Sequence, residues 1–334
     1  MKSVPSGFEL FDLWLGVEST KADDPLQVAS AAPYLAIWTA WLKTLPRPES
    51  VSAEAACQTS AWASATAAQV AKFVAPRKGQ RANHNTERRL SMVTRRRYFT
   101  VLDRIYEFAK GREWVPANPA AGVDKSETPV EVEQLGHVLA PELWKLLPAH
   151  FPTGDEMVDV RDRTVLTLLY ELALAPEEVR NLRPADLTSD GSSPLDMPTP
   201  SVLRVVGKRP SQSRALHLEV SARAALRAWL AARADFLEQA KADVDWLFFS
   251  SRGRQLTVPA LFTLVSAVVV RAGQDPAIKD RNLTPMRVGP QVLRNTAIVE
   301  MYRRGTTRAE LVPYLGLKNE KGLDRLRLRK STRS

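Results

Sequence analysis

One arginine lies where a helix would normally place only apolar side chains. Arg294 stands among Val292, Leu293, Ala297 and Ile298, which recur at the spacing of a helix. Because burying a charge without a partner is costly, Arg294 requires an anion nearby. That anion is either a carboxylate of the protein, in a structural ion pair, or a phosphate group of a ligand.

Positively charged residues also gather in two stretches that are far apart in the chain. Between Arg77 and Arg97 there are eight Lys or Arg residues and one Glu, and from Lys318 to the end there are seven with two acidic residues. A run of charges is commonly a solvated surface. In a chain with net charge +10 and a pI near 9.8, two such runs favour contacts with phosphate, and nucleic acid ahead of a membrane surface.

The composition argues against several other kinds of chemistry. The single cysteine, Cys57, excludes an internal disulfide and is expected to be a small core residue rather than a nucleophile. The four histidines are scattered without metal-ligand spacing, so we expect no metal and no cofactor. The sequence has no run of about 18 apolar residues and no recognisable signal peptide, so we expect a cytoplasmic, nucleoid-associated protein without membrane contact.

The elements that would position these groups fall into two domains, which 334 residues can accommodate. Residues 1–25 are interpreted as an N-terminal tail, with Phe8, Phe11 and Trp14 along an amphipathic arm. A helical domain is expected over 26–123. Its predicted helices cover 33–45, 52–73 and 90–110, and a polar, basic loop at 77–87 precedes the last of them.

Two of these helices carry patterns with a clear structural meaning. Leu35, Trp38, Trp41 and Leu42 share one face of the first helix, which we expect to be buried. Three successive arginines, 95–97, lead into the last helix at positions that we expect to be exposed.

The second domain is predicted over 137–334, after a linker at 124–136 that lacks a hydrophobic period. The stretch 201–218 alternates around the polar turn GKRPSQSR, which predicts a β-hairpin, and 246–250 is interpreted as a buried strand. Helices are predicted to begin at Pro141 and to cover 159–171, 222–232, 258–272, the surroundings of Arg294, and 308–315. The predicted fold class is therefore mainly α with a small β-hairpin or sheet (α+β).

The order of motifs in the second domain resembles that of the tyrosine recombinases, the phage-integrase family. The stretch 283–317 contains Pro-x-x-Leu-Arg-x-Thr, a helix, a turn at Gly305, a second helix and Leu-Gly. Upstream, LALAPEEVRNLRPADL is similar to the family's first signature, with Glu178, Leu182 and Asp186 on matching positions. The last helix of the first domain, followed by Gly, Trp and Asn-Pro, resembles the end of the family's helical, SAM-like core-binding domain.

The resemblance implies a reaction at a DNA phosphodiester without a metal. In the family a tyrosine attacks the phosphate, two arginines stabilise the developing charge, a hairpin lysine protonates the leaving oxygen and two histidine-type groups assist. The corresponding positions are Ala175, Lys208, Gln291, Arg294, Leu317 and Leu326. Lys208 and Arg294 retain the family's residue, and Gln291 is still a hydrogen-bond donor. No tyrosine follows Tyr314 in the chain.

These departures weigh against strand transfer by this chain alone. Losing one oxyanion donor typically costs a factor of about 10²–10³ in rate, and a leucine cannot form the covalent intermediate. Tyr302 and Tyr314 are expected to pack, and Ser331 and Thr332 would lack a general base. We therefore expect a duplex-DNA-binding protein that resembles a tyrosine recombinase but cannot cut and rejoin DNA alone. It would act as an accessory factor in recombination or mobile-element integration, or as a DNA-binding regulator.

Two alternatives stay open: an active recombinase with an unconventional or shared site, and a protein- or RNA-interaction module. Lys208 is as readily a solvated turn lysine as a phosphate ligand. The expected partners are double-stranded DNA and either an active recombinase or copies of this chain on DNA, with a monomer when free. The residues expected to contact DNA are Arg77, Lys78, Arg81, Arg88, Arg89, Arg95, Arg96, Arg97, Lys208, Arg209, Arg294, Lys318 and Lys321.

Overall fold

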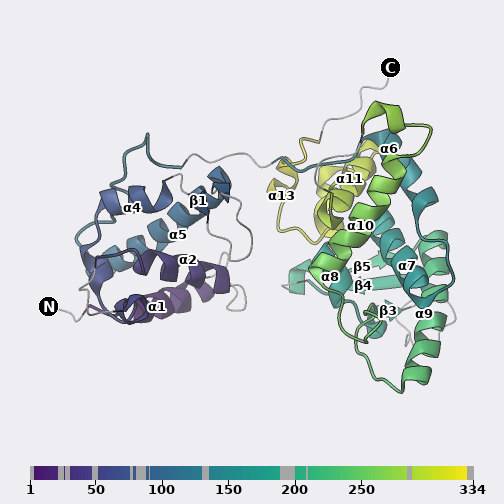
Figure 1. Ribbon diagram of the computed structural model, residues 1–334, viewed down its shortest axis with the longest axis horizontal. Coiled ribbons are helices and arrows are strands. Elements are labelled where there is room, and N and C mark those ends of the chain that lie inside the picture. The colour runs from purple at the N-terminus through teal and green to yellow at the C-terminus, as the bar shows by residue number, and fades with distance from the viewer. Residues whose placement is uncertain are drawn as a thin grey trace. The chain divides into compact units, whose positions relative to one another are not determined.

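The chain forms two compact units, Met1–Glu133 and Gln134–Ser334, each with its own hydrophobic core (Figure 1). The computed structural model describes residues 4–21, 26, 31–46, 52–75, 78–79, 88–89, 91–129, 135–188, 200–207, 210–283 and 288–328. Most elements in these ranges are helices, and the sheets are small, so the predicted mainly α fold with a small sheet is confirmed. No helix in these ranges is long and apolar enough to cross a membrane.

The first unit is built mainly from helices, with a short two-stranded antiparallel sheet. Its elements are α1 (Gly7–Ser19), α2 (Ala32–Leu42), α3 (Ala53–Ala56), the 3-10 helix η2 (Ala61–Ser64), α4 (Ala67–Val74), β1 (Lys78–Gly79), β2 (Arg88–Arg89) and α5 (Met92–Gly111). Helix α5 packs against α1, α2 and α4, and thus organises the unit.

The prediction of an N-terminal tail over residues 1–25 is wrong, because helix α1 covers most of this stretch. Ser6 caps this helix: its side chain accepts from the backbone N–H of Glu9, and the Glu9 carboxylate accepts from the N–H of Ser6. Leu10, Phe11 and Trp14 are almost fully buried in the core of the first unit. The apolar face that was predicted to lie along an amphipathic arm is therefore part of the core of this unit.

The prediction of a single helix over 52–73 is also wrong, because the three short helices α3, η2 and α4 occupy that stretch. Ser52 and Thr66 each accept a hydrogen bond from the first turn that follows, so they start α3 and α4 as new helices. These caps outweigh the helix propensity of the alanine-rich sequence. In α2 the predicted buried face holds for three of its residues, but Leu35 is 37% exposed.

Tyr106 of α5 lies at the centre of a cluster of tryptophans in the first unit. The indole N–H of Trp41 donates to the Tyr106 hydroxyl at 3.0 Å, and that hydroxyl donates to the carbonyl oxygen of Trp62 at 3.0 Å. The ring of Trp38 packs edge-on against the same tyrosine. Tyr106 is fully buried, and this burial raises the pKa of its hydroxyl above the ordinary value. The hydroxyl therefore stays protonated and bonded on both sides.

The second unit combines a helical body with a three-stranded antiparallel sheet in the order β3-β4-β5. The helices of its first half are α6 (Pro141–Leu146), η3 (Leu147–His150), α7 (Met157–Leu172), α8 (Pro176–Asn181) and η4 (Pro184–Asp186). The sheet consists of β3 (Leu187–Thr188), β4 (Val202–Val205) and β5 (Arg214–His217), with η6 (Pro210–Gln212) between the last two strands. The later helices are α9 (Val220–Ala240), α10 (Val258–Gly273), η7 (Lys279–Arg281), α11 (Pro290–Arg303), α12 (Arg308–Tyr314) and α13 (Lys321–Asp324).

Helix α7 forms the centre of the second unit, with α9 and α11 packed against it (Figure 1). Helix α12 lies beside β5, and α10 contacts α6, α8 and α11. The strand-like segment expected at 246–250 is buried, but it belongs to neither sheet. This stretch contributes only an isolated bridge between Phe249 and Gln255, while Phe248 and Phe249 pack against Trp229 of α9. Its apolar residues serve core packing and not a sheet.

We predict that Tyr106→Phe destabilises the first unit by about 1–3 kcal/mol, because it removes the hydroxyl that accepts from the buried Trp41 N–H and donates to the Trp62 carbonyl oxygen. Hydrogen exchange of the α2 and α5 amides in the full chain would measure the loss. The matched control is Tyr98→Phe, which removes a hydroxyl that bonds to no described residue and should leave exchange unchanged. Equal exchange in the Tyr106→Phe variant and the wild type would contradict the prediction.

Candidate functional site

A cavity of about 380 Å³ lies in the second unit beside Arg294. Ala175, Gln291, Arg294 and Leu317 all line it, although they are far apart in the sequence. Gly207 at the end of the described part of the hairpin turn lines it too. The cavity therefore brings together four of the six positions that the family resemblance assigns. The other two positions are Leu326, which does not line the cavity, and Lys208, which lies outside the described residues together with its neighbour Arg209.

Short-range features of the chain fix the elements that surround this cavity. Helices α8 and α11 each begin with a proline, at Pro176 and Pro290, where the missing N–H costs no hydrogen bond. Ala175 is the N-cap of α8, and Gln291 and Arg294 lie one turn apart on α11. The cavity is thus lined by the starts of two helices.

The Leu-Gly motif after α12 has a local reason for its glycine. Gly316 has a φ of +63°, a conformation that side-chain-bearing residues rarely adopt. A Cβ added there would also lie 2.6 Å from the carbonyl oxygen of Gln212 and 2.9 Å from Nη1 of Arg214. Glycine at this position allows the chain after α12 to pass directly over the hairpin.

Arg294 is buried, and its guanidinium is bonded to two groups of the protein. Its Nη1 donates to Oε2 of Glu178 at 3.0 Å, and its Nη2 donates to the carbonyl oxygen of Leu315 at 3.2 Å. Arg294 is 6% exposed, so these bonds lie in a poorly solvated place. Because a guanidinium has five N–H groups, the bonds to described residues leave three of them for another partner.

A second arginine, Arg214 on β5, holds the same carboxylate of Glu178. Its Nη1 and Nη2 donate to Oε1 and Oε2 of Glu178 at 2.8 and 3.1 Å, which is the forked geometry that suits a carboxylate. Its Nε donates to the carbonyl oxygen of Tyr314 at 2.6 Å. Sequence reasoning missed Arg214. The available signal was its position two residues before the buried Leu216, on the same face of the strand.

Burial and neighbouring charges shift the pKa of Glu178 and of Arg294. Burial acts to raise the pKa of the Glu178 carboxyl, but the hydrogen bonds from Arg214 and the charge of Arg294 outweigh it, so this pKa lies below its ordinary value of 4.5. Burial lowers the pKa of the Arg294 guanidinium, Glu178 opposes this shift, and Arg214 adds to it. Since arginine stays protonated in proteins, two positive charges share one carboxylate here at neutral pH.

Gln291 belongs to a second network at the edge of the same cavity. Its side-chain amide donates to Oδ1 of Asn295 at 2.9 Å, and the Asn295 amide donates to the carbonyl oxygen of His137 at 3.0 Å. Arg325 approaches the same Asn295 oxygen with its Nη2 at 3.5 Å. These bonds connect the start of α11 with the segment before α6 and with the segment after α13.

The position that corresponds to the family's nucleophile is part of the core. Leu326 is 9% exposed and packs with the main hydrophobic cluster of the second unit. A Cβ at Gly136 would lie only 2.6 Å from Cδ2 of Leu326, so the two chain segments meet closely there. Tyr302 and Tyr314 are half-buried against the same cluster, and neither lines the cavity beside Arg294.

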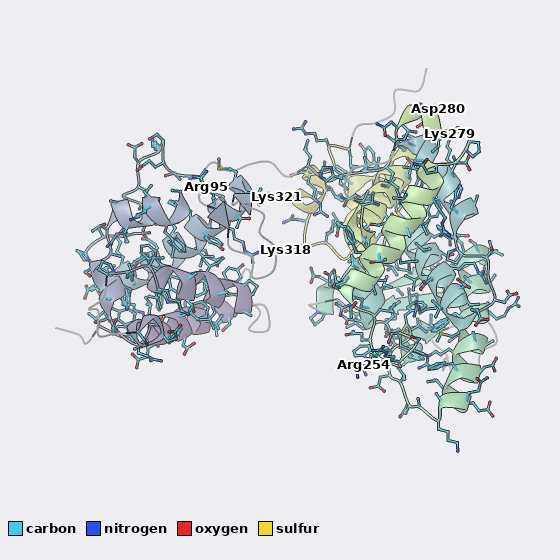
Figure 2. The ribbon with its side chains drawn as sticks, in the orientation of Figure 1. Arg95, Arg254, Lys279, Asp280, Lys318 and Lys321 are labelled. Carbon is cyan, nitrogen blue, oxygen red and sulfur yellow. The ribbon has the colours of Figure 1, made fainter. Side chains whose placement is uncertain are left out.

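The basic residues near the C-terminus lie on the surface of the second unit. Lys318 and Lys321 are exposed, in the segment that leads into α13 and at its first residue (Figure 2). Neither lines the cavity beside Arg294. Their position therefore suits a contact outside the cavity.

The basic residues of the first unit differ in their surroundings. Arg95 and Arg96 were expected to be exposed, which is wrong: both are half-buried within α5 and donate to the carbonyl oxygens of Val74 and Pro129. Arg97 is exposed and lies over the ring of Tyr34. The side chains of Lys78, Arg88 and Arg89 are not described, although their backbones form β1 and β2. Arg77 and Arg81 lie outside the described residues.

We predict that the stabilising effect of Glu178 depends on pH. A carboxyl whose pKa is lowered by folding stabilises the protein above its unfolded pKa, and this stabilisation is lost as the pH falls. Glu178→Gln should therefore lower the free energy of unfolding by on the order of 3 kcal/mol above pH ~6, and the difference from wild type should shrink below pH ~4.5. Chemical denaturation at several pH values would measure it.

The matched control for this experiment is Glu142→Gln, which removes an exposed carboxylate bonded to Arg281. Water screens this pair, so the substitution should change stability little at any pH. A difference between wild type and Glu178→Gln that stays constant across the pH range would show that the charge of Glu178 is not what stabilises the site.

The sequence of this chain is similar to a known protein family and to named members of it. The model of the phage integrase family matches residues 139–323. Tyrosine recombinase XerC of Ralstonia pickettii (strain 12J) is 30% identical over 192 residues, which cover 56% of this chain and 54% of that protein. Tyrosine recombinase XerD of Caulobacter vibrioides is 27% identical over 231 residues, 69% of this chain and 68% of that protein. The first alignment thus spans only about half of the relative.

Solved structures show the same fold. The XerH site-specific recombinase bound to difH substrate, in a pre-cleavage complex, superposes with a TM-score of 0.59 at 16% identity, over 98% of this chain and 83% of that one. The Tn1549 transposon integrase in complex with a circular intermediate DNA gives a TM-score of 0.61 at 12% identity, over 96% and 95%. The family match covers more than half of the sequence and includes Arg294 and the cavity-lining residues up to Leu317, and this chain belongs to the phage integrase family.

Proposed function

We propose that this chain binds duplex DNA in the manner of a tyrosine recombinase but does not cut and rejoin DNA on its own. The composition of the cavity beside Arg294 carries the proposal. Among its described lining residues there is no tyrosine, serine, threonine or cysteine. A phosphodiester held there would meet no described hydroxyl or thiol that could attack it, whereas covalent strand transfer requires one.

The same cavity supports binding of a phosphate group. Arg294 has guanidinium N–H groups that its bonds to described residues leave unused, and Gln291 adds a side-chain amide to the lining of the cavity. Lys318 and Lys321 add exposed positive charge in the segment that follows the cavity-lining Leu317. Binding through such groups is mainly phosphate neutralisation, so it would tolerate many sequences and weaken steeply with salt.

The proposed biological role is that of an accessory factor in recombination or mobile-element integration, or of a DNA-binding regulator. The partners would be double-stranded DNA and either an active recombinase or further copies of this chain on DNA. The XerC and XerD relatives are named as tyrosine recombinases, and the XerH and Tn1549 structures contain DNA. These similarities support DNA as the ligand of this chain.

A second candidate function is an active recombinase whose site is completed by another subunit. Arg294 and the ion pairs that it and Arg214 form with Glu178 favour this possibility, because part of the charged framework of such a site is present. A nucleophile from a neighbouring copy would then have to enter the cavity. The two functions differ in one observable product, a covalent bond between protein and DNA.

We predict salt-sensitive duplex binding without a covalent product. A titration of duplex DNA from the neighbourhood of the gene, at several salt concentrations, should give a plot of log K against log salt with a slope of about −0.9 for each phosphate neutralised. The same DNA as a nicked suicide substrate should give no protein–DNA adduct on denaturing gels. An active tyrosine recombinase with its own nicked site serves as the positive control.

Either of two results would overturn the proposal. A covalent adduct would establish strand cleavage, and the residue that carries it would identify the nucleophile. Absence of duplex binding at low salt would instead favour the protein- or RNA-interaction module, which the same titration with single-stranded RNA would then examine.

We also predict that the free chain is a monomer that associates only on DNA. Light scattering of the protein alone should give the mass of one chain, 37.1 kDa, at low and high salt. Addition of duplex DNA should raise the mass in steps of one chain. A dimer that persists in the absence of DNA at every salt concentration would contradict this prediction.

A further inference from the structure

Arg325 is held at the edge of the cavity by its own backbone and by the residue that follows it. The N–H of Gly136 donates to the carbonyl oxygen of Arg325 at 2.8 Å. Leu326, the next residue, is buried in the core. The hydrogen bond and the burial of Leu326 hold the main chain at Arg325 in place. The side chain of Arg325 lines the same cavity as Arg294.

The guanidinium of Arg325 makes few contacts with the described residues. Its side-chain hydrogen bond to them is the long contact of 3.5 Å to Oδ1 of Asn295, an oxygen that already accepts from Gln291 at 2.9 Å. Within the described ranges Arg325 forms no ion pair with a carboxylate. Arg325 is exposed at the cavity, and its charge contributes to lowering the pKa of the Arg294 guanidinium.

The charges of the described residues around the cavity do not balance. Arg214, Arg294 and Arg325 are positive, whereas Glu178, shared by the first two, and the exposed Glu177 are negative. Among these described groups one positive charge is therefore in excess at neutral pH. A phosphodiester carries a single negative charge, and it would offset this excess with oxygens that accept from both guanidiniums.

Position 175 supplies no cation to the cavity. Ala175 presents a methyl group where the family resemblance assigns an arginine, and its backbone N–H is bonded at 2.7 Å to Oε2 of Glu178, the oxygen that also accepts from Arg294. Among the described lining residues, the second guanidinium available to a phosphate bound at Arg294 is that of Arg325.

From this arrangement we infer that Arg294 and Arg325 together bind one phosphodiester group of the DNA. Arg325 supplies the second guanidinium, in place of the arginine that the family resemblance assigns to position 175. The inference rests on the proposed function, because it names the residues through which the bound duplex enters the cavity. Arg325 acts in binding, and no bond of the DNA is broken by it.

The test compares Arg325→Gln with a matched loss of charge elsewhere. The glutamine can still donate to Asn295 but carries no charge. The control is Lys279→Gln, which removes one exposed charge on η7 beyond the end of α10, well away from α13 (Figure 2). Arg325→Lys completes the set, because it keeps the charge without the fork of N–H groups.

Duplex binding of these full-length variants should separate them. Arg325→Gln should weaken binding about tenfold and reduce the salt slope by about one, the signature of a lost phosphate contact. Arg325→Lys should keep the slope and still bind more weakly than wild type, and Lys279→Gln should match the wild type. An unchanged slope in Arg325→Gln, with normal binding by the wild type, would overturn the inference but not the proposed function.

A second measurement tests the anion site without DNA. Inorganic phosphate should raise the thermal unfolding temperature of the wild type and of Lys279→Gln, and should raise it less in Arg325→Gln. If the wild type fails to bind duplex DNA, the proposed function fails, and this phosphate response still decides whether Arg325 contributes to an anion site. Equal stabilisation of all three proteins by phosphate would contradict that contribution.

Discussion

The carboxylate of Glu178 holds together the segments that make the cavity. It lies on α8 and binds Arg214 of β5 and Arg294 of α11, while these arginines also bind the carbonyl oxygens at the end of α12. In a poorly solvated place each of these charges is costly alone, and together they satisfy one another. The hairpin and three helices are thus fixed relative to one another by a single acidic group.

This arrangement bears on what the retained Arg294 means. The sequence left two partners open for it, a carboxylate of the protein or a phosphate, and the ion pair with Glu178 is present. A structural bond of this kind preserves an arginine whether or not DNA is cleaved, because removing it would leave buried charge without a partner. Arg294 alone is therefore a weak indicator of catalysis, and the neutral residues around it are more informative.

Much of the fold follows from local sequence signals. Helical spacing, the polar hairpin turn and the prolines at helix starts predicted the main elements, and the motif order predicted that Ala175, Gln291, Arg294 and Leu317 belong to one site. Arg214 escaped prediction, and Arg325 was included only as a member of the C-terminal basic run, because the place of each beside the cavity depends on contacts between segments distant in sequence. The tail that became α1 and the divided helix over 52–73 failed for a related reason: tertiary burial and capping outweighed the simpler pattern.

The close approach of Leu326 to Gly136 limits which side chains can stand at position 326. The leucine fills space at the junction of two segments, and a Cβ at the glycine would already lie 2.6 Å from its Cδ2. A tyrosine at 326 would need a larger volume than the leucine, and overfilling a packed core is itself destabilising. The segment before α6 would therefore have to move to accommodate it. Engineering a nucleophile into this chain at position 326 would thus require more than one substitution.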